Sequence, residues 1–93
     1  MLQQITGKRQ NNRIAMLRDA RPGMAETRDE LQRRLENIER WFARFGKRRH
    51  ETVRRYLPIM THERAVLRAK LKFADRVLAQ VDAQLAAGGN MED

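Results

Sequence analysis

Hydrophobic residues recur at helical spacing through two long stretches of the chain. In residues 27–57 they return at alternating steps of four and three, which is the heptad pattern of a helix packed along another helix. The pattern therefore predicts a long amphipathic helix over this stretch. The apolar positions of this first seam are Leu31, Leu35, Ile38, Phe42 and Phe45.

A second seam predicts a helix over residues 62–87, with Thr61 before it as N-cap. Val66, Phe73 and Val77 widen its apolar stripe to roughly 160° of arc, which is more than one partner helix covers. The seam itself consists of Leu67, Leu71, Ala74, Leu78, Val81 and Leu85.

Capping and breaking residues predict where these helices begin and end. The string Thr27-Arg28-Asp29-Glu30 is a capping box that starts the first helix. Pro22-Gly23 is expected to end any helical turns before it, so residues 1–26 are interpreted as a basic arm with a possible short helix. Gly88-Gly89 is expected to end the second helix, and residues 90–93 form a tail.

The weakest point of the first helix is Gly46, because glycine costs about 1 kcal/mol in a helix interior. Arg49 also falls on the seam, so either the helix kinks near Gly46 or Arg49 snorkels or pairs across an interface. We favour one continuous helix over 27–57 and a turn at 58–60. No stretch shows the alternation of a strand.

The predicted fold is all-α: a long antiparallel helical hairpin over residues 27–89. A lone hairpin leaves one side of each seam exposed to water. The wide stripe on the second helix therefore favours a homodimer in the form of a four-helix bundle.

Composition narrows the function. The chain has 93 residues, enough for one domain, and carries 20 Lys+Arg against 12 Asp+Glu, a net charge of +8. It lacks both cysteine and serine, which excludes thiolate metal sites and serine or cysteine nucleophiles. We expect no enzyme activity, no cofactor and no metal. No apolar run is long enough for a membrane span, and the N-terminus lacks the apolar core of a signal peptide, so a cytoplasmic location is expected.

Positive charge gathers in residues 44–55, with six basic residues and one acid, and in 64–76, with five and one. A turn at 58–60 would place these clusters side by side, with the acids at the open end. Like charges four residues apart repel within a helix. The basic ridge, the row of cations at this spacing within residues 64–76, therefore suggests an anionic partner. The residues predicted to bind nucleic acid are Arg33, Arg40, Arg44, Lys47, Arg48, Arg54, Arg55, Arg64, Arg68, Lys72 and Arg76.

A row of cations along a helical rod suits a phosphate backbone. The sequence has no base-reading module, and the seams account for most of its aromatic residues. This favours sequence-independent binding of a duplex, most readily an A-form RNA recognised by its shape.

The stretch Arg33-Arg34-Leu35-Glu36-Asn37-Ile38 and the later Arg54-Arg55 give the chain a resemblance to the small RNA-silencing suppressors of nodaviruses. In that family a basic helical hairpin dimerises into an antiparallel four-helix bundle along one face of double-stranded RNA. The resemblance implies a viral protein in the host cytoplasm that shields duplex RNA from dicing enzymes and from guide-strand loading.

Other interpretations stay open. The seams equally suit a helical protein–protein interaction factor without nucleic-acid activity, such as a phage or plasmid regulator, an inhibitor or a secretion chaperone. The basic ridge could be a solvated face.

Trp41-Phe42 beside basic residues suits a membrane surface, although a bundle seam explains them better. Arg44 and His50 have a spacing that resembles the ribonuclease motif of HEPN-type proteins, but this spacing is common by chance in an Arg-rich chain, so His50 is expected to be a surface residue.

Overall fold

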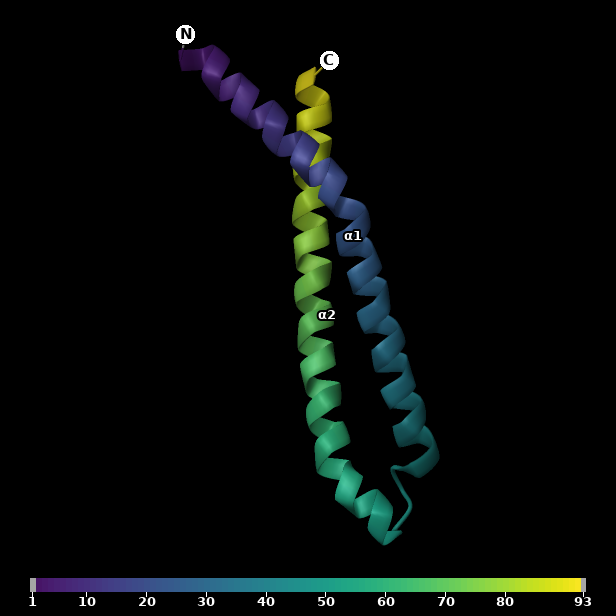
Figure 1. The fold of residues 1–93 in the computed structure, drawn as a ribbon. Coiled ribbons are helices and arrows are strands. Elements are labelled where there is room, and N and C mark those ends of the chain that lie inside the picture. The colour runs from purple at the N-terminus through teal and green to yellow at the C-terminus, as the bar shows by residue number, and fades with distance from the viewer. Residues whose placement is uncertain (1, 93) are drawn as a thin grey trace.

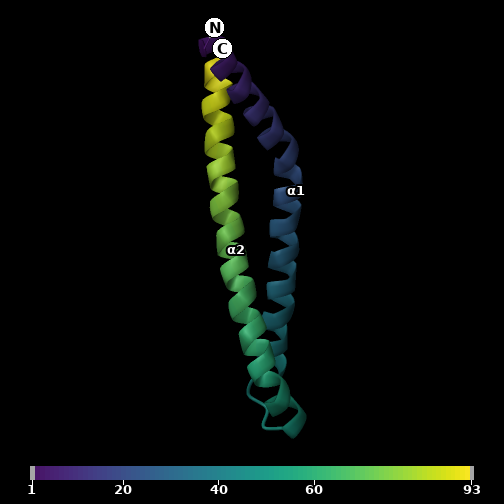
Figure 2. The same ribbon diagram turned by 60° about the vertical axis from the view of Figure 1, so that its left-hand side comes forward.

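The chain folds into two long antiparallel helices joined by a short turn. The computed structural model describes the backbone of residues 2–92 and the side chains of residues 12–88. Helix α1 spans Leu2–Phe45 and α2 spans Glu51–Glu92, in a rod of 71 × 20 × 15 Å. Both termini lie at one end of the rod and the turn lies at the other (Figures 1 and 2). The predicted all-α hairpin is confirmed, and residues 2–92 contain no strand.

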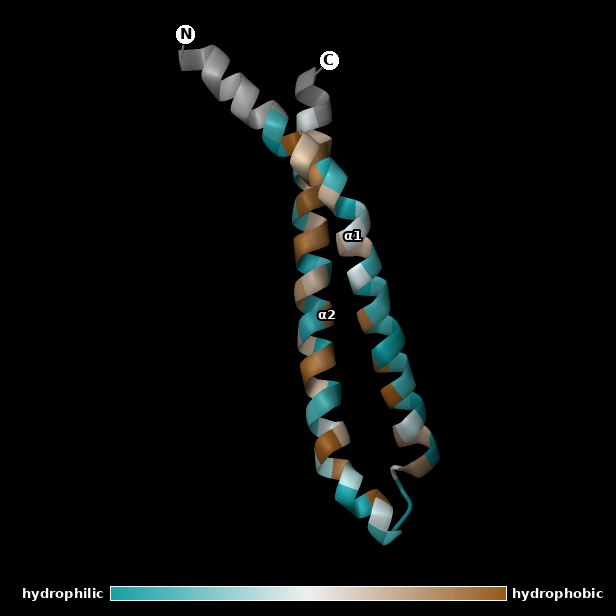
Figure 3. Ribbon diagram, viewed as in Figure 1, coloured by the Kyte–Doolittle hydropathy of each residue, from teal (hydrophilic) through white to brown (hydrophobic). Residues whose placement is uncertain are grey.

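The two predicted seams form the contact between the helices. Ile38, Leu67 and Val81 are the buried hydrophobic residues of the described part, and Leu67 is the most enclosed at 1% exposure. The remaining seam positions are half-buried. Apolar positions recur along α2, and those of α1 lie on the side that faces α2 (Figure 3). The core is therefore a single narrow line of side chains between two helices.

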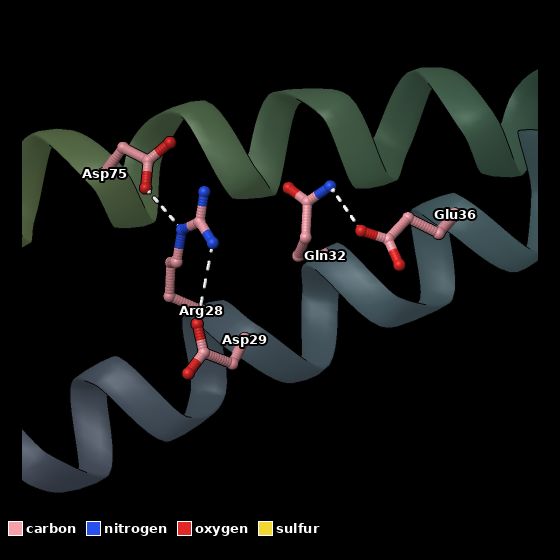
Figure 4. A network of polar contacts seen from close by, with 5 residues as sticks. All are labelled: Arg28, Asp29, Gln32, Glu36 and Asp75. Atoms are coloured by element: carbon pink, nitrogen blue, oxygen red, sulfur yellow. Dashed lines mark hydrogen bonds and ion pairs between the residues drawn. The ribbon is translucent and has the colours of Figure 1, made fainter.

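Ion pairs between the helices fix which residues lie opposite one another. Arg28 Nε donates to Asp75 Oδ1 at 2.7 Å and Nη1 of the same side chain lies 3.5 Å from Asp29 (Figure 4). Closer to the termini, Arg21 pairs with Asp82 at 2.5 Å and 3.2 Å. These hydrogen bonds lower the pKa of the Asp82 carboxyl below its ordinary value. Their contribution to stability is therefore present at neutral pH and is lost as the pH falls through that lowered pKa.

The prediction that helix formation stops at Pro22 and restarts at Thr27 was wrong. Helix α1 runs through both, so residues 2–26 are part of the helix and not an arm. Thr27 does not cap a helix; its hydroxyl donates to the carbonyl oxygen of Gly23 at 2.9 Å. Proline and a threonine bonded back to the preceding turn both bend helices, and α1 changes direction in its N-terminal half (Figure 1). The helix therefore continues through Pro22, which lies in the bent half of α1.

The prediction of a continuous helix over 27–57 with a turn at 58–60 was also wrong. Helix α1 ends at Phe45, where Gly46 N–H donates to the carbonyl oxygen of Phe42 at 2.8 Å. A Cβ at Gly46 would lie 2.5 Å from that oxygen, so a residue with a side chain would force the backbone to shift. The turn therefore falls at residues 46–50. It begins at Gly46, the residue near which the sequence allowed a kink as an alternative.

Helix α2 begins eleven residues before the predicted start at 62 and extends beyond the predicted stop. Pro58 and Thr61 lie inside it. The first turns of α2 tilt away from the axis of the rest (Figure 1), in the stretch that contains Pro58. Gly88 does not end the helix. It is buried, and a Cβ there would lie 2.3 Å from Ile14 Cδ1, so the glycine allows close packing of α1 on α2. The helix continues to Glu92, so residues 90–92 of the predicted tail are helical.

Candidate nucleic-acid interface

The turn end of the hairpin carries most of the net charge. Residues 40–55 contain seven basic residues and one acid, a net of +6 out of the +8 of the whole chain. All seven basic side chains are exposed. We name them the turn-end cluster: Arg40, Arg44, Lys47, Arg48, Arg49, Arg54 and Arg55.

Three consecutive parts of the chain supply this cluster. Arg40 and Arg44 lie on the last two turns of α1, the turn 46–50 carries three more cations, and Arg54 and Arg55 lie on the first turns of α2. Within the described residues, the acid that pairs with the cluster is Glu51, 3.8 Å from Arg55. The cluster is therefore an exposed and largely unneutralised positive surface.

Aromatic rings support two of these cations. The guanidinium carbons of Arg44 and Arg48 both lie 5.3 Å from the centroid of the Phe45 ring. Phe45 in turn packs against Trp41, with ring centroids 6.0 Å apart. Cation–π contact is worth about 0.5–1 kcal/mol at an exposed site. Arg44 and Arg48 are thus partly ordered before any ligand arrives.

His50 accepts two backbone hydrogen bonds where the turn meets α2. Its Nδ1 accepts a hydrogen bond from Thr52 N–H at 3.2 Å, and its carbonyl oxygen accepts one from Arg54 N–H at 3.0 Å. The imidazole therefore takes an N-cap position at the start of α2. It is exposed, as the sequence predicted. Among the described residues, no group of three His, Asp or Glu could hold a metal ion.

Beyond Arg54 and Arg55, helix α2 contributes four more predicted site residues, of which two are used for contacts between the helices. Arg68 lies 2.8 Å and Arg64 3.9 Å from the carboxylate of Glu39. The Arg64 guanidinium also lies 3.9 Å from the centroid of the Phe42 ring, and its side chain is only 27% exposed. Arg64 therefore ties α2 to α1. Lys72 and Arg76 are exposed and have no polar partner within the described part of the chain.

The two basic clusters do not lie side by side as predicted. With the turn at 46–50, residues 64–76 lie opposite residues 27–39, as the Arg28–Asp75 and Glu39–Arg64 pairs show. Arg33 is exposed on this middle part of the rod. The acids are not confined to the open end either, because Glu39 and Glu63 make ion pairs along the rod. Neutralisation is thus strongest along the middle and weakest at the turn.

The sequence-based site omitted Arg49. It was assigned to a helix seam, whereas the structure places it in the turn, exposed beside Lys47 and Arg48. The run Gly46-Lys47-Arg48-Arg49 carried the signal, because a glycine followed by three cations suits a solvated turn better than a buried seam.

Comparison with protein-family models, with curated proteins and with solved structures found no match to this chain. The nodavirus resemblance therefore rests on the sequence pattern alone. No helix in the described residues combines the length and apolarity needed to cross a membrane.

Proposed function

We propose that the protein binds nucleic acid through the phosphate backbone, independently of base sequence, with the turn-end cluster as the binding surface. The observation that supports this proposal is the contrast in neutralisation along the rod. Along the rod, five arginines pair with acids of the opposite helix: Arg21, Arg28, Arg34, Arg64 and Arg68. The turn end concentrates seven exposed cations around one acid. Repulsion among these like charges costs stability, and an anionic ligand relieves it.

The residue types favour phosphate over a single carboxylate partner. Six of the seven cations are arginines, whose planar guanidinium forms paired hydrogen bonds with phosphate oxygens. The cluster is exposed and spread over two helix ends and a turn, so it suits a repeating, extended anion. The half-buried rings of Trp41, Phe42 and Phe45 are occupied with one another and with arginines. This supports backbone contact rather than stacking on bases.

Among nucleic acids we propose duplex RNA as the preferred ligand and suppression of RNA silencing as its consequence. The support for this finer proposal is the resemblance given above and the absence of a base-reading module. A protein of this kind acts by covering the duplex, so bound RNA is expected to resist cleavage by a dicing ribonuclease.

The site is tested by a triple variant in which Lys47, Arg49 and Arg54 are replaced by glutamine. These side chains are exposed and have no side-chain partner within the described residues, so the fold is expected to stay intact. Each lost phosphate contact reduces the salt slope by about 1. We therefore expect a slope lower by about 3 and an affinity at least about tenfold weaker at physiological salt, measured by fluorescence anisotropy on duplex RNA.

A matched control removes the same charge elsewhere. Arg33, Lys72 and Arg76 were predicted site residues, are exposed, and lie along the middle of the rod. Their replacement by glutamine changes the net charge by the same amount and is expected to leave the slope nearly unchanged. Equal losses in the two triple variants would show that net charge alone drives binding. A larger loss in the control would place the interface on the rod.

A further inference from the structure

The hairpin exposes more surface than a compact monomer of its mass. Its accessible surface is 7756 Å², whereas a compact monomer of 11.0 kDa exposes about 5,600 Å². The excess is about 2,100 Å². Each subunit of an obligate homodimer buries on the order of 1,000–2,500 Å². The single line of buried residues therefore leaves enough surface for one large interface.

An uncovered apolar groove runs along one side of the hairpin. It has a volume of about 930 Å³ and runs between the part of α1 near Gly23 and the part of α2 near Phe73. Phe73 lies on it with 68% of its surface exposed. The residues that line it are mostly small or apolar: Ala20, Gly23, Met24, Thr27, Leu31, Ala69, Lys70, Phe73, Ala74 and Val77.

The groove holds both parts of a self-complementary contact. Ala20, Gly23 and Ala69 are small residues that leave a hollow in its lining, and a Cβ built on Gly23 meets nothing within 4 Å. Phe73 is a large projecting side chain on the same surface. In a two-fold dimer the same patch is used on both subunits. Each Phe73 can therefore fill the hollow of the other copy, and both hollows are filled at once.

The charges around the groove also suit a second copy. On α1, the exposed acids Asp19 and Glu30 lie one helical turn from lining residues and have no polar partner within the described part. On α2, the exposed base Lys70 lines the groove. A two-fold contact that sets α1 against α2 of the other copy can bring Lys70 of each copy toward these acids.

We propose that this groove is the homodimer interface, with Phe73 of each hairpin seated between the Gly23 and Ala69 surfaces of the other. The dimer is a four-helix bundle whose two turn-end clusters remain exposed. This proposal does not depend on nucleic-acid binding.

Sedimentation equilibrium of the full chain tests the proposal. The wild type is expected at about twice the monomer mass of 11.0 kDa, and Phe73→Asp at the monomer mass. Ile59 is a matched control because it is 61% exposed and lies outside the groove, so Ile59→Asp is expected to remain dimeric. A monomeric wild type, or a Phe73→Asp variant that dimerises like the wild type, would overturn the proposal.

A second variant keeps the test decisive if Phe73→Asp unfolds. A Cβ at Gly23 meets nothing within 4 Å, so Gly23→Leu is expected to fill the hollow from within its own hairpin, and it replaces glycine by a stronger helix former. We expect a helical protein, by circular dichroism, whose dimer dissociation constant is at least about tenfold higher than that of the wild type. Unchanged dimerisation of Gly23→Leu would rule out this groove as the interface.

Discussion

Replacing Leu67 by alanine is expected to lower the free energy of unfolding by about 2–5 kcal/mol. Leu67 is 1% exposed and is the most enclosed side chain of the described part. The core is a single line of residues, so neighbouring side chains have little freedom to close the cavity. A hairpin of this size has few other buried contacts with which to offset the loss.

Urea unfolding followed by circular dichroism measures this change. Ile59→Ala is the control, because Ile59 is a β-branched residue of the same helix that is 61% exposed. Its replacement is expected to change stability by less than about 0.5 kcal/mol. If Leu67→Ala were no more damaging than Ile59→Ala, the proposed packing of α2 on α1 would be wrong.

Replacing Pro22 by alanine is expected to raise the free energy of unfolding by roughly 1–3 kcal/mol. Pro22 lies inside α1, where it cannot donate to the preceding turn and its ring crowds that turn. Alanine restores the hydrogen bond and has the highest helix propensity. The expected gain is smaller than the full proline cost, because the bent helix already accommodates the ring.

This substitution separates the structure from the sequence-based expectation. If residues 1–26 were a loosely held arm, Pro22→Ala would leave stability unchanged. If α1 is continuous, stability rises, and Pro58→Ala in α2 is expected to act in the same direction. Lower stability of Pro22→Ala would contradict this expectation and would show that the bend is needed to bring Ile14 against Gly88.

Periodicity was a reliable guide to the packed faces. Ile38, Leu67 and Val81 were all assigned to seams, and all are buried. This success has a physical cause, because the spacing of apolar residues reflects which side of a helix loses contact with water. Phe73 was assigned to the widened stripe and is exposed in the single hairpin, since one partner helix covers only part of so wide a stripe.

Helix ends were predicted poorly because the residues that usually end helices have other uses here. Pro22 and Pro58 lie inside helices that packing maintains on both sides, and Gly88 permits close contact with Ile14. Gly46 does end a helix, although apolar residues at helical spacing on both sides of it favoured a continuous helix. Single residues set a local preference, whereas a seam of many contacts determines whether the helix continues.

The candidate site shows the same dependence on the turn. Its cations could be found from charge density alone, and six of the seven turn-end residues were predicted. The arrangement of these cations could not be predicted, because moving the turn from 58–60 to 46–50 separates the two basic clusters. It also sets Arg64 and Arg68 against Glu39. Which cations are paired with acids depends on which residues of the two helices lie opposite one another, and this register cannot be read from the hydrophobic pattern alone.

Binding of a duplex through its phosphates is tested most directly with the wild-type protein. Fluorescence anisotropy is measured on one sequence of about 25 base pairs, made as RNA and as DNA, over about 50–200 mM salt. We expect tight binding of duplex RNA, a slope of log affinity against log salt of about −4 to −6, and weaker binding of duplex DNA. Equal binding of both duplexes would support the phosphate interface and rule out a preference for RNA. No binding of either duplex at low salt would show that the protein does not bind nucleic acid in this way.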